Sequence, residues 1–469
     1  MKLLNLLTAS VLDHDGRGNG MTRLLVVGRT VYGGRNALAY VFSCISRTYG
    51  SRVRLVAVED NPTSIIRDGV DKGFKVLVLY SVPTPFFIEL AKEIKQVLRI
   101  PGVTVAAGGP HASGAYWQLL RIGVKASIVA DGEPAVLGLV EYVLGERDIS
   151  EVPNIGFMDG DTPRITRIRL LEDIGLYDAH YEPLEMYPPI EIMRGCFYYC
   201  KFCQVPYMFK AKPRYRSLES ILRSVRAWIR AGRRSIRFVA PIGPAYQSSR
   251  PGEPNLDALE ELLSRVRSEG GKPYLGTFPS ETRPEYAGPE VLKVLKRYVA
   301  NRRLAIGLQV ADDDLLRSML RGHSVRDVEE AIDYAIKYGF KPVIDIIMGL
   351  PGEDEDAIKA TCRFMELYAE KGVSFRLHTF MPLPGTPLAL SGPAVVHDEY
   401  RRCIRRLLGK GVIEGDWREQ EKLSRLFYCI NAYDPKPSRY PKPLEEASRV
   451  CRDVWVKLGQ LYSASEPLT

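Results

Sequence analysis

Short apolar runs alternate with amphipathic stretches between Met21 and about Leu144, and this pattern predicts a sheet covered by helices. The predicted strands are Leu24–Val27, Val53–Ala57, Val76–Tyr80, Val103–Ala107 and Ser127–Val129. The predicted helices are Asn36–Tyr49, Thr84–Val97, Gly114–Ile122 and Ala135–Leu144. Continuous apolar strands separated by helices are typical of a Rossmann-like, doubly wound parallel sheet. Such sheets bind ligands at the carboxyl ends of their strands.

A second series of strands and helices starts at Ile190. Its predicted strands are Ile190–Arg194, Ser235–Ala240, Pro273–Phe278, Leu304–Gln309, Pro342–Met348 and Val373–Phe380. Because six units are too few to close an eight-stranded barrel, we expect a partial, open (β/α)6 barrel.

The chain therefore divides into five predicted parts, all within an α/β fold class. We expect a flexible tail over residues 1–20 and the Rossmann-like domain over residues 21–148. Residues 149–189 are rich in proline and turn residues, which predicts a linker. The barrel covers residues 190–390, and residues 391–469 predict a small helical C-terminal domain.

Composition narrows the class of protein only slightly. Lys plus Arg is 65 and Asp plus Glu is 56 among 469 residues, so the formal net charge is +9. This charge permits an anionic partner, nucleic acid included, without indicating one. No apolar run reaches the roughly 18 residues of a membrane-spanning helix, and we expect a cytoplasmic protein. Five of the eight cysteines are scattered, which favours a reducing compartment.

The other three cysteines lie within eight residues, at Cys196, Cys200 and Cys203. They follow the first predicted barrel strand with the spacing Cys-x3-Cys-x2-Cys. Thiolates are soft ligands that suit iron–sulfur clusters or zinc. A closed structural zinc site needs four ligands, and no nearby Cys or His completes a set. Three cysteines on a 4Fe–4S cluster would leave one iron open for another ligand.

This loop, with Phe202 before its last cysteine, resembles the hallmark of the radical S-adenosylmethionine (SAM) superfamily. The resemblance implies a 4Fe–4S cluster whose open iron binds SAM. It also implies an external electron donor such as ferredoxin or flavodoxin, and reductive cleavage of SAM to a 5′-deoxyadenosyl radical.

Further motifs extend the resemblance over about residues 186–390. They are Gln309, Arg321-Gly-His323-Ser324, Ile347–Glu353 and Pro382–Pro387. The resemblance suggests that Gln309 bonds the ribose or carboxylate of SAM. Gly349 would approach the adenine or close a tight turn.

Other positions after the barrel strands carry their own expectations. Glu281 and Arg283 suit a zwitterionic ligand. The family's Gly-Gly-Glu is replaced by Ala240-Pro-Ile-Gly243-Pro, so backbone carbonyls would bind the amino group of SAM. A turn or a surface ion pair remains the alternative for each of these positions. His323 is expected to be a structural residue at a helix start.

The first domain resembles the cobalamin-binding module that precedes some radical SAM cores. Ser81 stands at the module's tail-binding serine, Gly108-Gly109 at its paired glycines and Asp131-Gly-Glu133 at its last loop. The module's Asp-x-His-x-x-Gly loop is not found in this sequence: the corresponding residues, 28–34, contain no histidine. Cobalamin would therefore lack a histidine ligand, and a module that has lost cobalamin is the alternative. His111 is expected to be structural or a corrin-edge contact.

The leading hypothesis is a cobalamin-dependent radical SAM methyltransferase acting on an unactivated carbon. Radical rearrangement, cyclisation or RNA modification without cobalamin is the second, and a non-catalytic cofactor-binding sensor the third. Methylthiotransferases share the core motifs but bring three further cysteines, whereas this first domain has only Cys44. The basic residues 401–406 could meet an anionic substrate or form a solvated helix face. The substrate, the catalytic residues and the oligomeric state are not predicted.

Overall fold

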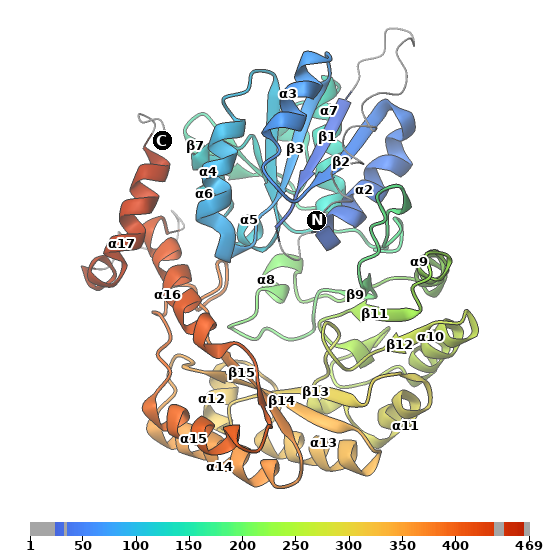
Figure 1. Cartoon of the computed structure of the whole chain (residues 1–469), viewed down its shortest axis with the longest axis vertical. Coiled ribbons are helices and arrows are strands. Elements are labelled where there is room, and N and C mark those ends of the chain that lie inside the picture. Colours follow the sequence, from blue (N-terminus) through green and yellow to red (C-terminus); the bar gives the residue numbers. More distant parts are fainter. Residues whose placement is uncertain (1–23, 32–34, 436–444, 464–469) are drawn as a thin grey trace.

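The computed structural model describes residues 24–31, 35–435 and 445–463. The predicted tail over residues 1–20 lies outside this part of the chain. Figure 1 shows the first domain above the barrel, with the C-terminal helices running along one side of both. None of the described helices has the length and apolar composition needed to cross a membrane.

The first domain is a seven-stranded sheet in the order β2-β1-β3-β4-β5-β6-β7. Its parallel strands are β1 (Leu24–Arg29), β2 (Val53–Val58), β3 (Lys75–Ser81), β4 (Val103–Gly108) and β5 (Ala126–Ile128). The helices α2 (Arg35–Tyr49) and α7 (Gly132–Leu144) cover one face. The other face carries α3 (Thr63–Asp71), α4 (Phe87–Val97), α5 (Pro110–Gly114) and α6 (Tyr116–Ile122). The predicted doubly wound sheet is confirmed, and α3 is a helix that the apolar pattern missed.

Residues 149–189 are more than the expected linker. They contribute β6 (Ile155–Asp159) and β7 (Thr162–Ile165), an antiparallel hairpin added to the edge of the sheet. Gly160, at φ +57°, makes the two-residue turn, which suits a hairpin connection. The pattern did not predict these strands because β6 ends in exposed residues and β7 is exposed along most of its length, so neither is a continuous buried apolar run.

The barrel is open and has two sheets. One has the order β12-β11-β8 and the other β13-β14-β15-β16. The strands are β8 (Ile190–Glu191), β11 (Ser235–Val239), β12 (Lys272–Tyr274), β13 (Arg303–Gln309), β14 (Lys341–Met348), β15 (Ser374–Thr379) and β16 (Ile413–Glu414). A parallel bridge between Thr282 and Ile306 connects the two sheets. The first predicted strand is interrupted after Glu191 and continues as β9 (Met193–Arg194).

Helices cover the outside of the barrel, as the amphipathic pattern predicts. They are α9 (Leu218–Arg230), α10 (Leu256–Ser268), α11 (Pro289–Tyr298), α12 (Asp313–Ser318), α13 (Val325–Lys337) and α14 (Glu355–Ala369). Their apolar faces form one continuous core with the strands. A capping box formed by Ser324 and Asp327 starts α13.

The C-terminal segment does not form a core of its own. Its helices are α15 (Asp398–Leu408), α16 (Trp417–Tyr433) and α17 (Glu445–Tyr462). Tyr400 and Trp417 join the barrel core, whereas Cys429 and Leu458 join the core of the first domain. The segment therefore ties the two larger units together, because its apolar faces are shared between them.

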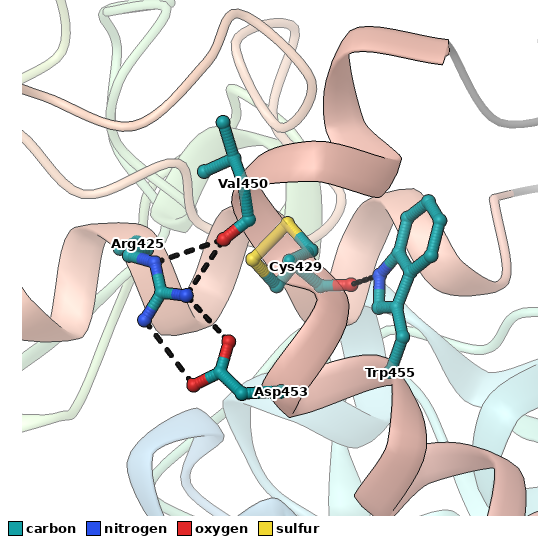
Figure 2. The surroundings of a disulfide bond; sticks show 6 residues. Arg425, Cys429, Val450, Asp453 and Trp455 are labelled. Carbon is teal, nitrogen blue, oxygen red and sulfur yellow. Dashed lines mark hydrogen bonds and ion pairs between the residues drawn. A yellow bond between two sulfur atoms is a disulfide. The ribbon is translucent and has the colours of Figure 1, made fainter.

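A disulfide joins Cys429 on α16 to Cys451 on α17, with a Cα–Cα distance of 5.3 Å. This pair departs from the expectation that the scattered cysteines are reduced. Figure 2 shows Arg425 beside it, bound to the Val450 carbonyl and to Asp453. The sequence pattern could not show that two residues on separate helices would meet.

Candidate functional site

The cluster loop, defined here as residues 195–213, carries the three crowded cysteines. A two-residue antiparallel ladder closes its base, pairing β9 with β10 (Arg214–Tyr215). Gly195 has φ +84°, and a Cβ there would lie 2.8 Å from the Lys212 carbonyl oxygen. Only glycine fits this position at the start of the loop.

Cys196 and Cys200 are buried, and Cys203 is half-buried. Burial and the neighbouring Cys200 and Cys196 together raise the pKa of Cys203 to about 12. Within the described ranges, no three His, Cys, Asp or Glu side chains converge as one metal ion would require. A cluster differs from a zinc ion in spreading its thiolates over different irons. These soft, shielded and neighbouring donors therefore fit a 4Fe–4S cluster.

Two arginines lie against the cluster loop. The Nη1 atom of Arg321 is 3.3 Å from Cys200 Sγ, and its guanidinium lies 5.7 Å from the centre of the Phe202 ring. The Nη1 atom of Arg283 is 3.9 Å from the same sulfur, and its guanidinium lies 3.5 Å from the Tyr198 ring centre. Arg283 thus lies near the cluster loop, and its binding of a zwitterionic ligand stays a prediction. Arg321 was not singled out, although it belongs to the Arg-Gly-His motif.

Gln309 ends β13 in a strained conformation. Its φ is +85°, and the register of β13 shifts between Gly307 and Gln309. A Cβ at Gly307 would lie 2.6 Å from Gln309 Nε2 and 3.1 Å from Arg321 Nη2. Gln309 and Arg321 therefore converge over Gly307. Such strain at a buried non-glycine residue is typical of functional sites.

Glu281 does not join Arg283. Its Oε1 atom lies 2.5 Å from Arg376 Nη2, and Arg376 also bonds Asp345. Burial and the nearby Asp345 raise the pKa of Glu281. The two residues expected to bind one zwitterion thus lie in different surroundings, and the structure shows Glu281 in an ion cluster of the barrel interior.

Gly349 closes the turn after β14. It has φ +75°, and a Cβ there would lie 2.9 Å from the Ala394 Cβ atom. Its N–H donates to Glu353 Oε2 at 2.7 Å, while Tyr400 donates to Glu353 Oε1 at 2.6 Å. The tight turn accounts for this glycine, and its contact with a nucleotide stays a prediction.

His323 is buried, and its Nδ1 atom lies 3.3 Å from an Arg283 nitrogen. Burial and the two nearby arginines lower its pKa to about 2. A neutral histidine held between arginines fits the structural role expected for it.

The carboxyl edge of the first sheet brings together the residues expected to bind cobalamin. Ser81 and Gly108 are paired neighbours on β3 and β4. A Cβ at Gly108 would lie 3.5 Å from Ile128, so a larger side chain would fill the space above the strand. Gly109 has φ +100°, and a Cβ there would lie 3.1 Å from the Val82 nitrogen. Residues 32–34, in the loop that replaces the family's histidine loop, lie outside the described ranges.

His111 offers no ligand to a metal in this conformation. It is fully buried and stacks on Phe87 at 4.1 Å between ring centres. Burial lowers its pKa to about 3. A buried, neutral ring stacked within the core is consistent with a structural role, and a corrin-edge contact stays a prediction.

Buried ion pairs join the first domain to the cluster loop. Arg194, directly before that loop, bonds Glu133 at 3.0 and 2.8 Å. Arg214, its partner across the ladder, bonds Asp131. All four side chains are at most 7% exposed. The sequence pattern missed this cluster because its partners are 61 and 83 residues apart.

A cavity of about 280 Å³ lies where the two domains meet. It is lined by Tyr116 and Trp117 of the first domain, Tyr207 and Met208 of the cluster loop, and Pro384 after β15. The Gln204 amide donates to the carbonyls of Pro384 at 2.7 Å and Pro110 at 3.3 Å, which holds these segments together. Its lining residues include no histidine.

Comparisons with known proteins connect this arrangement to radical chemistry. Residues 190–365 match the profile of the Radical SAM superfamily. The tRNA-2-methylthio-N(6)-dimethylallyladenosine synthase of Halorhodospira halophila is 26% identical over 318 residues, which cover 66% of this chain and 62% of the synthase.

Two solved structures share the fold. The radical SAM methyltransferase TsrM of Kitasatospora setae, bound to cobalamin and a [4Fe-4S] cluster, has a TM-score of 0.63 and 15% identity over 80% of this chain and 78% of its own. The cobalamin-dependent radical SAM enzyme OxsB has a TM-score of 0.62 and 15% identity over 76% of this chain. The match spans about half of OxsB, 53% of its chain. These likenesses show the arrangement of the two α/β units.

Proposed function

This chain carries a radical SAM domain over residues 190–365, and from that premise we propose that it is a cobalamin-dependent methyltransferase of an unactivated carbon. The domain implies a 4Fe–4S cluster and SAM, as the three cysteines predict. Which carbon is methylated is not part of the proposal.

One observation carries the proposal. The cavity between the domains is lined both by the cluster loop, at Tyr207 and Met208, and by the carboxyl side of the first sheet, at Val129 and Ala130. Doubly wound sheets bind ligands on that side. A cofactor held by the first domain would therefore lie next to the cluster loop, as a two-cofactor reaction requires.

Different residues of the chain would hold the cluster and contact SAM. Cys196, Cys200 and Cys203 would hold the cluster, while Arg321 and Arg283 place positive charge beside it. Gln309 is a candidate contact to SAM.

Ser81, Gly108 and Gly109 would accept the cobalamin tail at the sheet edge, and residues 28–34 contain no histidine that could bind the cobalt. The cluster would supply the electron that cleaves the sulfonium of SAM, and the corrin would supply a carrier for its methyl group.

Radical modification without cobalamin is the second candidate function. The tRNA-modifying relative favours it, since 66% of this chain aligns with that synthase. A methylthiotransferase function would need further cluster-binding cysteines in the first domain. The described part of that domain contains only Cys44, which is buried on α2.

The test is the visible spectrum of protein purified without oxygen from cells supplied with hydroxocobalamin. We expect both cluster and corrin absorption in the wild-type chain. Gly108→Leu, which fills the space above β4, should lose the corrin and keep the iron. Cys200→Ala should keep the corrin and lose the cluster. Wild-type protein that holds its cluster but no corrin would eliminate the methyltransferase mechanism and favour the second candidate.

A further inference from the structure

A second cavity, of about 610 Å³, lies on the inner side of the barrel strands. Alternate residues of a strand face opposite sides of a sheet. On β13, Leu304 and Ile306 pack into the core under the helices, whereas Arg303 and Ala305 line the cavity. The strand register places Val343 of β14 beside Ala305, which continues the same apolar surface.

Three arginines line this cavity, and two of them are neutralised. Arg376 contacts both Asp345 and Glu281, at 2.6 and 2.5 Å. Arg303 lies 2.5 Å from Glu414.

Arg237 differs from both. Its guanidinium donates to the Phe278 carbonyl at 3.1 Å and lies 4.8 Å from the Tyr274 ring centre. Over the described ranges no carboxylate pairs with it, so positive charge remains uncompensated on the β11 wall. Guanidinium groups bind carboxylates and phosphates with paired hydrogen bonds.

Phe278 supplies the second half of the recognition chemistry. It lines the cavity, yet 65% of its side chain is exposed. Its own backbone carbonyl accepts the Arg237 hydrogen bond, so the exposed ring and the unpaired charge are adjacent. An exposed aromatic ring in a concave site is suited to stacking on a planar ligand.

We infer that this cavity binds a small molecule in which an aromatic ring carries one carboxylate or phosphate group. Arg237 bonds the anionic group, and Phe278 stacks on the ring. Val239, Ala305 and Val343 provide the apolar floor. Binding itself does not depend on the proposed function.

The position of the cavity relates it to the cluster loop. Thr277, Phe278 and Pro279 line it, and the same segment continues to Arg283, which lies 3.9 Å from Cys200 Sγ. From Pro279, the last of these lining residues, to Arg283 a fully extended chain spans at most about 14 Å. If the proposed function holds, the ligand is therefore the substrate of the radical reaction or a part of it.

The test is calorimetric titration of the reconstituted full-length protein with four probes. Benzoate and phenyl phosphate carry ring and charge, benzamide carries only the ring, and inorganic phosphate only the charge. We expect benzoate or phenyl phosphate to bind about tenfold more tightly than the other two, because one charge-assisted hydrogen bond is added to ring contact. Whichever of benzoate and phenyl phosphate binds more tightly shows whether the site prefers a carboxylate or a phosphate.

Variants distinguish binding in this cavity from a general effect of the protein's positive charge. Arg237→Gln should remove the tenfold preference, Arg237→Lys should retain part of it, and Phe278→Ala should weaken the ring-bearing probes. Arg326→Gln, at a side chain 84% exposed on α13, should bind like the wild type. Unfolding midpoints and iron contents measured in parallel establish that each variant is folded.

Wild-type protein that binds benzamide as tightly as both benzoate and phenyl phosphate, or folded Arg237→Gln that keeps the full preference, overturns the site. A chain that shows the preference but forms no cluster overturns the proposed function and leaves this site standing. The two failures are therefore distinguishable.

Discussion

The carboxylate of Glu133 and the guanidinium of Arg194 meet across the boundary between the two domains, with hydrogen bonds of 3.0 and 2.8 Å. Arg194 also bonds Glu191 on its own side, at 2.7 Å. The first domain thus holds the strand that leads directly into Gly195 and Cys196. Breaking this pair should affect both the stability of the chain and the loop that carries the thiols.

Glu133→Gln should destabilise the folded chain by about 3–5 kcal/mol, because it leaves Arg194 buried with one carboxylate fewer. Denaturant unfolding followed by tryptophan fluorescence measures the change. Glu330→Gln, which breaks an exposed i,i+4 pair with Arg326, is the control and should cost at most about 0.5 kcal/mol. Equal effects of the two substitutions would contradict the role of the buried pair.

The same carboxylates predict loss of stability in acid. Burial alone would raise the pKa of Glu133 and of Asp131, but Arg194 and Arg214 outweigh it and hold both pKa values below their ordinary 4.5 and 3.8. Carboxyls with depressed folded pKa values stabilise the fold above their unfolded pKa and lose this contribution as the pH falls. The unfolding midpoint should therefore drop as the pH falls below about 4.5, and it should drop less in Glu133→Gln. Parallel acid profiles of the two proteins would contradict this assignment.

Glu353 predicts a second pH dependence of opposite sign. Burial raises its pKa from 4.5 to about 7. Between these values the folded chain binds more protons than the unfolded chain, so the free energy of unfolding should fall as the pH rises. Glu353→Gln keeps an acceptor for the Gly349 N–H and should remove this slope. Thermal melts between pH 4.5 and about 7 measure this slope of stability against pH. The control Glu330→Gln should retain the wild-type slope. An unchanged slope in Glu353→Gln would count against the assignment.

Arg321 should tune the cluster. Its positive charge, 3.3 Å from Cys200 Sγ, favours the reduced and more negative state. Arg321→Gln should lower the midpoint potential by on the order of 60 mV, which is about 1.4 kcal/mol for one electron. A redox titration followed by electron paramagnetic resonance measures the shift. Arg321→Lys should shift it less, and a potential unchanged in Arg321→Gln would refute the effect.

The fold was largely predictable because parallel strands that are buried on both faces consist of continuous apolar runs in the sequence. The five parallel strands of the first sheet were all found, since both faces of these strands are buried. The β6–β7 hairpin was not, because its exposed residues lack that signal. The C-terminal helices were predicted as helices, but their amphipathic pattern could not show that Tyr400 packs on the barrel and Leu458 on the first domain.

The sequence predicts those site residues that lie close together along the chain. It does not predict contacts between residues that only folding brings together. Cys196, Cys200 and Cys203 lie on one loop, so their spacing indicates a metal or cluster site, and its resemblance to the radical SAM hallmark implies the cluster. Arg321 reaches Cys200 from 121 residues away, and no local pattern reports that contact. Glu281 and Arg283 are two residues apart, yet their side chains have different partners.

Cys196, Cys200 and Cys203 would hold a cluster with one iron open to SAM. The most direct measurement is the iron content and electron paramagnetic resonance spectrum of the reconstituted, reduced chain, with and without SAM. We expect about four irons per chain and a spectrum that changes when SAM is added, with both lost in Cys200→Ala and retained in Cys44→Ala. A chain that binds zinc in place of iron, or a cluster whose spectrum ignores SAM, would contradict it.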